Sequence, residues 1–135
     1  MSTNDKRYYQ HTLHYFPSVE NDASRITWAH AVNSREKLEE ALKSELNCSL
    51  QLVFSIFFFL GSLLFIEADI LIGSGSPLPI MAHPPHTTSD LTFTDFLQEC
   101  KSTTKGLKLD FKDINALQPC LEQLEIQKDT VRRLR

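Results

Sequence analysis

Two carboxylates lie one residue apart in a short apolar run, Ile66-Glu67-Ala68-Asp69-Ile70-Leu71-Ile72. This alternation predicts a strand on which Glu67 and Asp69 share one face, while Ala68 and Ile70 share the other. Neighbouring carboxylates repel each other, and the arrangement is favourable when a divalent cation lies between them or when one keeps its proton. The pair therefore indicates a metal site or a proton-transfer site, and the plain alternative is an ordinary solvent-facing strand.

Three further apolar segments, at residues 26–33, 79–85 and 106–112, each carry polar side chains at or near their carboxyl ends. These side chains are His30, His83, Asp110 and Lys112. In a parallel α/β sheet or barrel the carboxyl ends of the strands meet at one face, so we expect these groups to converge with the carboxylate pair. Two imidazoles, three carboxylates and an ammonium group can form a metal-assisted acid–base site.

Four segments, taken in order, resemble the successive signatures of the menorin family. They are residues 28–34, 66–71, 79–85 and 105–112. That family in turn resembles the phospholipase-C-like phosphodiesterases, which are TIM barrels and include glycerophosphodiester phosphodiesterases and spider-venom sphingomyelinase D. The match covers residues 26–125 of the chain. The resemblance implies an α/β fold that is a partial TIM barrel of about three βα units, to which the apolar run at residues 46–66 adds an extra hydrophobic helix.

The resemblance also implies a role for each candidate residue. It makes His30 and His83 the general acid and base, Glu67 and Asp69 the holders of Mg²⁺ or Ca²⁺, Asp110 a further metal-site carboxylate, and Lys112 a phosphate-facing cation. A metal ion and a lysine would neutralise the charge of a phosphodiester, while one imidazole deprotonates the attacking hydroxyl and the other protonates the leaving oxygen. The phosphodiesterases usually have an arginine and a Pro-Glu-Asn segment after the first histidine. This chain has Ala31-Val32-Asn33 there and so lacks a phosphate-binding cation.

The chain is short for the fold that the resemblance implies. It has 135 residues and a formal net charge of −3, whereas a TIM barrel needs about 200 to 250 residues and eight units. We expect residues 26–135 to be the N-terminal part of a menorin-like barrel domain, and residues 1–25 to be a polar arm. An open piece of a barrel exposes a strand edge, which predicts marginal stability or dependence on a partner. No basic block with interleaved aromatics supports nucleic-acid binding.

An uncharged, largely apolar run extends from residue 46 to residue 66. Its length suits a transmembrane helix, which needs about 20 residues. A spanning helix would place His30 and Glu67 on opposite sides of a membrane, and the site could not assemble. We therefore interpret most of residues 47–65 as an insertion, rich in residues with pyrimidine-heavy codons, as in a translated intron tail. Membrane contact through residues 46–66 and a buried helix of a larger barrel remain the alternatives.

Local signals also predict the helices and the state of the cysteines. Ser34 is placed to cap a helix that begins at residues 33–37, and apolar residues at helical spacing predict further helices around residues 93–100 and 114–135. The cysteines Cys48, Cys100 and Cys120 show neither disulfide-framework nor zinc spacing, so we expect free thiols.

Two classes of function follow from these observations. The enzyme class is a phosphodiesterase-type metal site in a truncated chain that is weakly active or inactive, acting on a phosphodiester. The binding class follows from the resemblance alone, which implies an extracellular protein that contacts cell-surface adhesion molecules and receptors. The first ten residues form no apolar signal segment, so the resemblance is the sole ground for an extracellular location. A third possibility is that the truncated chain folds into nothing active.

Overall fold

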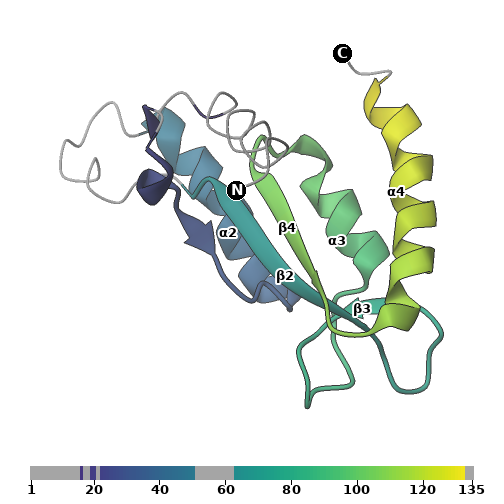
Figure 1. Cartoon of the computed structure of the whole chain (residues 1–135). Coiled ribbons are helices and arrows are strands. Elements are labelled where there is room, and N and C mark those ends of the chain that lie inside the picture. The colour runs from purple at the N-terminus through teal and green to yellow at the C-terminus, as the bar shows by residue number, and fades with distance from the viewer. Residues whose placement is uncertain (1–15, 17–18, 21, 51–62, 133–135) are drawn as a thin grey trace, which may run out of the picture.

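Four strands and three α-helices make up the part of the chain that the computed structural model describes, namely residues 16, 19–20, 22–50 and 63–132 (Figure 1). The strands are β1 (Trp28–Ala29), β2 (Phe65–Ile72), β3 (Pro79–Met81) and β4 (Gly106–Phe111). The α-helices are α2 (Arg35–Leu50), α3 (Phe93–Glu99) and α4 (Leu117–Arg132), and short 3₁₀ turns occupy Ala23–Arg25, Cys100–Ser102 and Ile114–Ala116. The expected α/β class is confirmed.

The long strand β2 lies at the centre of the sheet. It pairs in parallel with β1 near its start and in parallel with β4 along its other edge. A helix follows each of these three strands in the chain: α2 after β1, α3 after β2 and its hairpin, and α4 after β4. The described residues therefore contain the three strand–helix units that the sequence predicts.

Strand β3 departs from the expected parallel arrangement. It pairs antiparallel with β2, with Ile70 opposite Met81 and Ile72 opposite Pro79. Residues 73–78 are the only connection between the two strands, and a parallel crossover needs about a dozen residues or more. The loop includes Gly75 at a φ of 80°, a backbone conformation that glycine adopts without steric cost. His83 therefore reaches the sheet on a returning hairpin, not at the carboxyl end of a parallel strand.

The apolar face of β2 forms the core together with the helices. Ile66, Ala68 and Ile70 are fully buried, and they belong to one cluster with side chains from α2, α3 and α4. The members of that cluster from the helices include Leu38, Ala41, Phe93, Phe96, Leu97 and Cys120. Because side chains alternate along a strand, packing the helices on this face leaves Glu67 and Asp69 on the opposite face.

Polar side chains fix the starts of the helices. The Ser34 hydroxyl accepts a hydrogen bond from the Lys37 amide (3.3 Å), as expected of a cap on α2, and the Thr92 hydroxyl accepts one from the Asp95 amide (3.1 Å) at the start of α3. An ion pair between Arg35 and Asp95 joins the two helices. The predicted start of the first helix is confirmed.

The expected N-terminal arm and apolar insertion are only partly covered by the described residues. Phe16 and Val19 are buried, and the Phe16 ring packs on Phe65 with centroids 5.2 Å apart. Helix α2 continues through Leu50 and β2 begins at Phe65, so both ends of the expected 47–65 insertion belong to regular elements. The core of that run, at residues 51–62, lies outside the described residues, as does the extra hydrophobic helix expected there.

Two further expectations can be compared with the described residues. None of the helices described is both long and apolar enough to cross a membrane. Cys100 and Cys120 are buried and form no disulfide bond, as predicted. Burial raises the pKa of the Cys120 thiol to about 12, so at neutral pH this side chain packs as an uncharged apolar group. The side chain of Cys48 lies outside the described ones.

Replacement of Gly106 by alanine should destabilise the pairing of β2 with β4. A Cβ atom at this position would clash with Phe65 Cε1, and the Phe65 ring is stacked on Trp28 with centroids 4.5 Å apart. We expect Gly106→Ala to lower the free energy of unfolding by about 1–3 kcal/mol, measured by chemical denaturation. In a Phe65→Ala background the same change should cost much less, and an equal cost in both backgrounds would rule out the clash.

Candidate functional site

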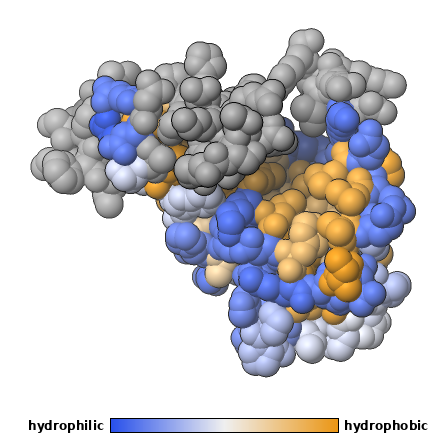
Figure 2. Space-filling view, viewed as in Figure 1, coloured by the Kyte–Doolittle hydropathy of each residue, from blue (hydrophilic) through white to orange (hydrophobic). Residues whose placement is uncertain are grey.

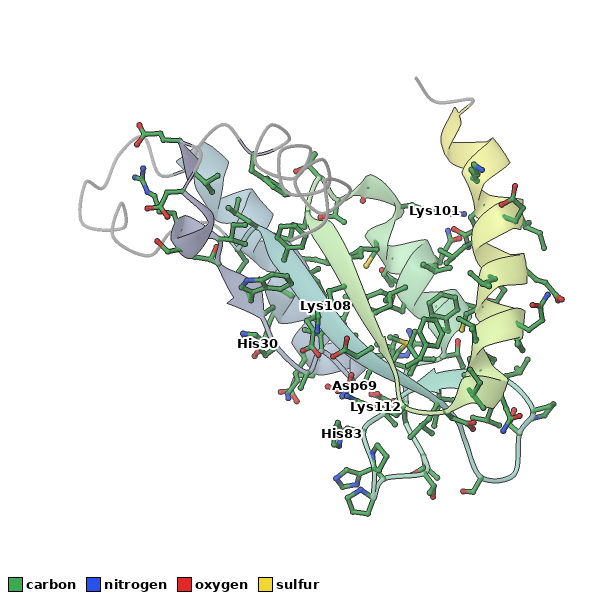
Figure 3. All side chains as sticks on the ribbon, in the orientation of Figure 1. His30, Asp69, His83, Lys101, Lys108 and Lys112 are labelled. Carbon is green, nitrogen blue, oxygen red and sulfur yellow. The ribbon has the colours of Figure 1, made fainter. Side chains whose placement is uncertain are left out.

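Three carboxylates converge on the face of the sheet opposite the helices. Glu67 and Asp69 come from β2 and Asp110 from β4, where the strand register places Asp110 directly opposite Asp69. One oxygen from each of the three groups can be chosen so that all lie within 4.8 Å of one another. Figure 3 shows Asp69 on this face together with His30, His83, Lys108 and Lys112. We call Glu67, Asp69 and Asp110 the carboxylate cluster.

Two lysines lie against the carboxylate cluster: Lys108 belongs to β4, and Lys112 directly follows that strand. Lys108 Nζ lies 2.8 Å from Asp110 Oδ2 and 3.9 Å from Glu67 Oε1. Lys112 Nζ lies 3.0 Å from Asp69 Oδ1 and 3.9 Å from Asp110 Oδ2. The hydrogen bond from Lys108 lowers the pKa of Asp110, and the hydrogen bond to Asp69 raises the pKa of Lys112. At neutral pH the Asp110 carboxylate is therefore ionised and the Lys112 side chain is protonated.

The turn after β1 holds the two β2 carboxylates in place. The Ala31 amide donates to Glu67 Oε2 (2.8 Å), and Ala31 has a φ of 51°, which is uncommon for a residue with a side chain. The Asn33 side chain binds Asp69 twice: its Nδ2 donates to Asp69 Oδ2 (2.8 Å), and its Oδ1 accepts from the Asp69 amide (2.9 Å). The side chain of Asp69 is only 4% exposed, so these bonds replace water that the carboxylate has lost.

The two histidines lie at the edge of the cluster with exposed rings. The side chain of His30 is 72% exposed, and its Nδ1 lies 3.7 Å from Glu67 Oε2. The His30 ring stacks on Trp28 with centroids 6.2 Å apart. His83 Nδ1 lies 2.6 Å from the Pro84 carbonyl oxygen, which can only accept a hydrogen bond. This contact places the proton of a neutral His83 on Nδ1 and leaves Nε2 with its lone pair free to act.

A pocket of about 540 Å³ opens beside the carboxylate cluster. Its wall includes Ala31 and Asn33, the two residues of the turn that bind Glu67 and Asp69. The rest of the wall comes from the start of α2 and from residues 81–90, with Lys37, His83 and Asp90 among its charged or titratable groups. The pocket and the cluster therefore share one wall.

The donor set of the cluster suits a hard divalent cation. Carboxylate oxygens are preferred ligands of both Ca²⁺ and Mg²⁺. Oxygens on opposite sides of one Ca²⁺ lie about 4.8 Å apart, and those of one Mg²⁺ about 4.2 Å apart. The spread of the three oxygens is within the first limit. A cation would have to displace the ammonium groups of Lys108 and Lys112 from these oxygens. The affinity of the site for a metal ion therefore depends on how strongly the two lysines compete for the carboxylates.

The structure brings together five of the six residues that the sequence predicts for the site. Glu67, Asp69, Asp110, Lys112 and His30 lie within 4 Å of at least one other member. His83 lies at the same side of the sheet in Figure 3 and lines the adjoining pocket. Lys108 is not among these six residues, although strand alternation places it on the same face as Asp110.

Comparisons with known proteins agree with the family resemblance. Residues 22–133 match the family described as the Menorin N-terminal domain. The chain is 38% identical over 115 residues to Protein FAM151B of Homo sapiens, an alignment that covers 83% of this chain and 36% of that protein. The chain thus spans about a third of the length of this curated relative. No solved structure matches the chain significantly.

Loss of the Asn33 side chain should destabilise the site and the fold together. The change Asn33→Ala removes the acceptor of the buried Asp69 amide and one donor to its carboxylate. We expect the free energy of unfolding to fall by about 1–3 kcal/mol, measured by chemical denaturation. The exposed Asn115 offers a control, since Asn115→Ala should change stability by less than about 1 kcal/mol. Equal effects of the two changes would contradict the role of Asn33.

Proposed function

The chain belongs to the menorin family, and from the geometry of its carboxylate cluster we propose that it carries a divalent-metal site for the cleavage of phosphodiesters. The observation that supports this best is the convergence of Glu67, Asp69 and Asp110 between a turn and two lysines. The resemblance of the family to phospholipase-C-like phosphodiesterases supports the choice of substrate class. Mg²⁺ and Ca²⁺ are the proposed ions.

The proposed fold of the whole domain is a TIM barrel, of which this chain supplies the first three units. The parallel pairing of β1, β2 and β4 supports this, because each of these strands is followed by a helix. The helices pack on one face of the sheet, and the charged cluster occupies the other. That other face would become the inner face of a closed barrel, and such enzymes build their sites at the carboxyl ends of the barrel strands.

The two histidines are proposed to divide acid and base roles according to their contacts. His83 donates from Nδ1 to the Pro84 carbonyl, so its Nε2 can take the proton of the attacking hydroxyl. His30 Nδ1 lies 3.7 Å from Glu67 Oε2, and His30 is the group proposed to protonate the leaving oxygen. A bound divalent cation would neutralise charge on a phosphate oxygen. Lys112 contacts Asp69 and Asp110, and its ammonium group would have to move from these carboxylates when a cation binds them.

Metal binding by the full chain tests the carboxylate cluster. We expect isothermal calorimetry to detect one Ca²⁺ or Mg²⁺ per chain, and Asp110→Asn to weaken binding by about tenfold or more, since it removes one anionic ligand. The matched control is Glu39→Gln, because Glu39 is an exposed carboxylate on α2 that pairs with Lys43. A heat signal that is absent from the unmodified chain, or that is the same in all three proteins, would refute the site.

Turnover of a phosphodiester tests the histidines. His30→Ala and His83→Ala should each lower kcat by about 10²-fold or more, the usual contribution of a general acid or base. The rate of the unmodified chain should show a bell-shaped pH profile. Chelation of divalent metal should abolish the turnover. Lys101 lies far from the cluster in Figure 3, so Lys101→Ala should leave the rate unchanged. Turnover that survives both histidine changes would exclude this mechanism.

An apolar surface favours the second candidate function, protein binding without catalysis. Figure 2 shows hydrophobic residues gathered between β4 and α4. Leu107 of β4 and Leu121 and Ile126 of α4 are exposed, Ile126 by 72%. An extracellular adhesion factor would use such a surface to contact a cell-surface protein. In a closed barrel the next strand–helix unit would cover the same surface. Turnover that is lost on His30→Ala would favour phosphodiester cleavage over protein binding without catalysis.

A further inference from the structure

The pocket beside the carboxylate cluster holds a lysine that the proposed chemistry leaves without a role. Lys37 lines the pocket from the first turn of α2, and His83 lines it from the loop after β3. Lys37 Nζ donates to the Ala31 carbonyl oxygen at 3.1 Å, while the Ala31 amide donates to Glu67. One residue of the turn therefore connects the lysine of the pocket to a carboxylate of the cluster.

The charges around the site differ between the cluster and the pocket. In the cluster, Lys108 and Lys112 each lie within 3.0 Å of a carboxylate oxygen, and three carboxylates exceed two ammonium groups. An anion that approached the cluster without a metal ion would meet net negative charge. Within the described residues, Lys37 Nζ has no carboxylate partner within 4.0 Å, so its charge is available to a ligand.

The other charged group of the pocket is already bound to the protein. One oxygen of Asp90 accepts a hydrogen bond from the Arg35 amide (3.1 Å) at the start of α2. The neighbouring Ser89 hydroxyl donates to the Asn33 carbonyl oxygen (3.0 Å). These groups shape the wall, whereas the remaining Nζ hydrogens of Lys37 are donors that the wall does not use.

We propose that Lys37 is a specificity-determining residue whose ammonium group binds an anionic oxygen of a phosphodiester in the pocket, opposite His83. The inference rests on the proposed function, and it names Lys37 as the cation that pairs with the negative charge of the substrate. A non-bridging oxygen held by Lys37 would keep the diester in the pocket, whose wall includes Ala31, the residue that also binds Glu67 of the cluster. Diesters are then favoured over neutral esters by a charge-assisted hydrogen bond.

The position of Lys37 makes the variant informative. A cation in the first turn of a helix opposes the helix dipole, so the removal of the charge partly offsets the loss of the hydrogen bond to the Ala31 carbonyl, and the net change in stability should be small. Lys43, farther along the same helix, is an exposed lysine whose Nζ lies 3.3 Å from Glu39. The changes Lys37→Gln and Lys43→Gln therefore remove equal charge from one helix, and only Lys37 lines the pocket.

Binding of dimethyl phosphate, the smallest phosphodiester probe, tests the inference on the full chain. Titrations followed by NMR in the presence of a chelator exclude any contribution of metal. We expect the ring signals of His83 to shift in the unmodified chain, and Lys37→Gln to raise the Kd about tenfold. Lys43→Gln should leave the Kd within about twofold, and Lys37→Arg should retain most of the affinity.

Each outcome decides the inference separately from the metal site. An equal loss in Lys37→Gln and Lys43→Gln, or an unmodified chain that binds no probe, would overturn it. A specific loss in Lys37→Gln supports it, even where calorimetry finds no metal binding and the proposed function fails. With an active chain, Lys37→Gln should raise KM more than it lowers kcat, because Lys37 holds substrate and transition state alike.

Discussion

The pairing of β2 with β4 places two carboxylates, Asp69 and Asp110, directly opposite each other on neighbouring strands. Like charges at such positions destabilise a sheet, and here the ammonium groups of Lys108 and Lys112 offset their repulsion. The register cannot shift by one residue, because the carboxylates of the shifted strand would then face the helices. The apolar core and the charged face therefore depend on the same strand alignment.

The turn after β1 extends this dependence to the pocket. Ala31 uses its amide for Glu67 and its carbonyl oxygen for Lys37, and its positive φ lets both groups point to different partners. Asn33 adds two bonds to Asp69, and the Val32 amide donates to the Glu67 carbonyl oxygen. A segment of three residues thus connects the sheet to the start of α2, and five hydrogen bonds offset the backbone strain at Ala31.

Much of the fold could be predicted from the sequence because strands and helices leave periodic patterns. Alternation placed Glu67 and Asp69 on one face of β2, and Ser34 marked the start of α2, as the structure confirms. The direction of β3 could not be derived from its apolar residues, since these are the same for both directions of pairing. Only the short loop before Pro79 carries that information, through its length.

The site was predicted less completely than the fold. The candidate residues followed from strand alternation and from the ends of the apolar segments. The resemblance to the menorin family, a membership that the comparisons confirm, supplied their chemical roles, which remain predictions. The contact of Lys108 with Asp110 depends on side-chain conformation, and the pocket is formed by residues 31–37 and 81–90, which are distant in the sequence. Local sequence patterns contain neither kind of information.

The hairpin formed by β2 and β3 has a consequence for the order in which the parts of the site assemble. Its strands are neighbours in the chain, and the Ala82 amide donates to the Asp69 carbonyl oxygen (3.0 Å). Closing this short loop costs little chain entropy. Asp110, in contrast, belongs to β4, which follows α3 in the chain, so a much longer loop must close to bring it to β2. The segment with His83 can thus fold against β2 as a local unit, and the lysines that balance the carboxylates join only when β4 docks.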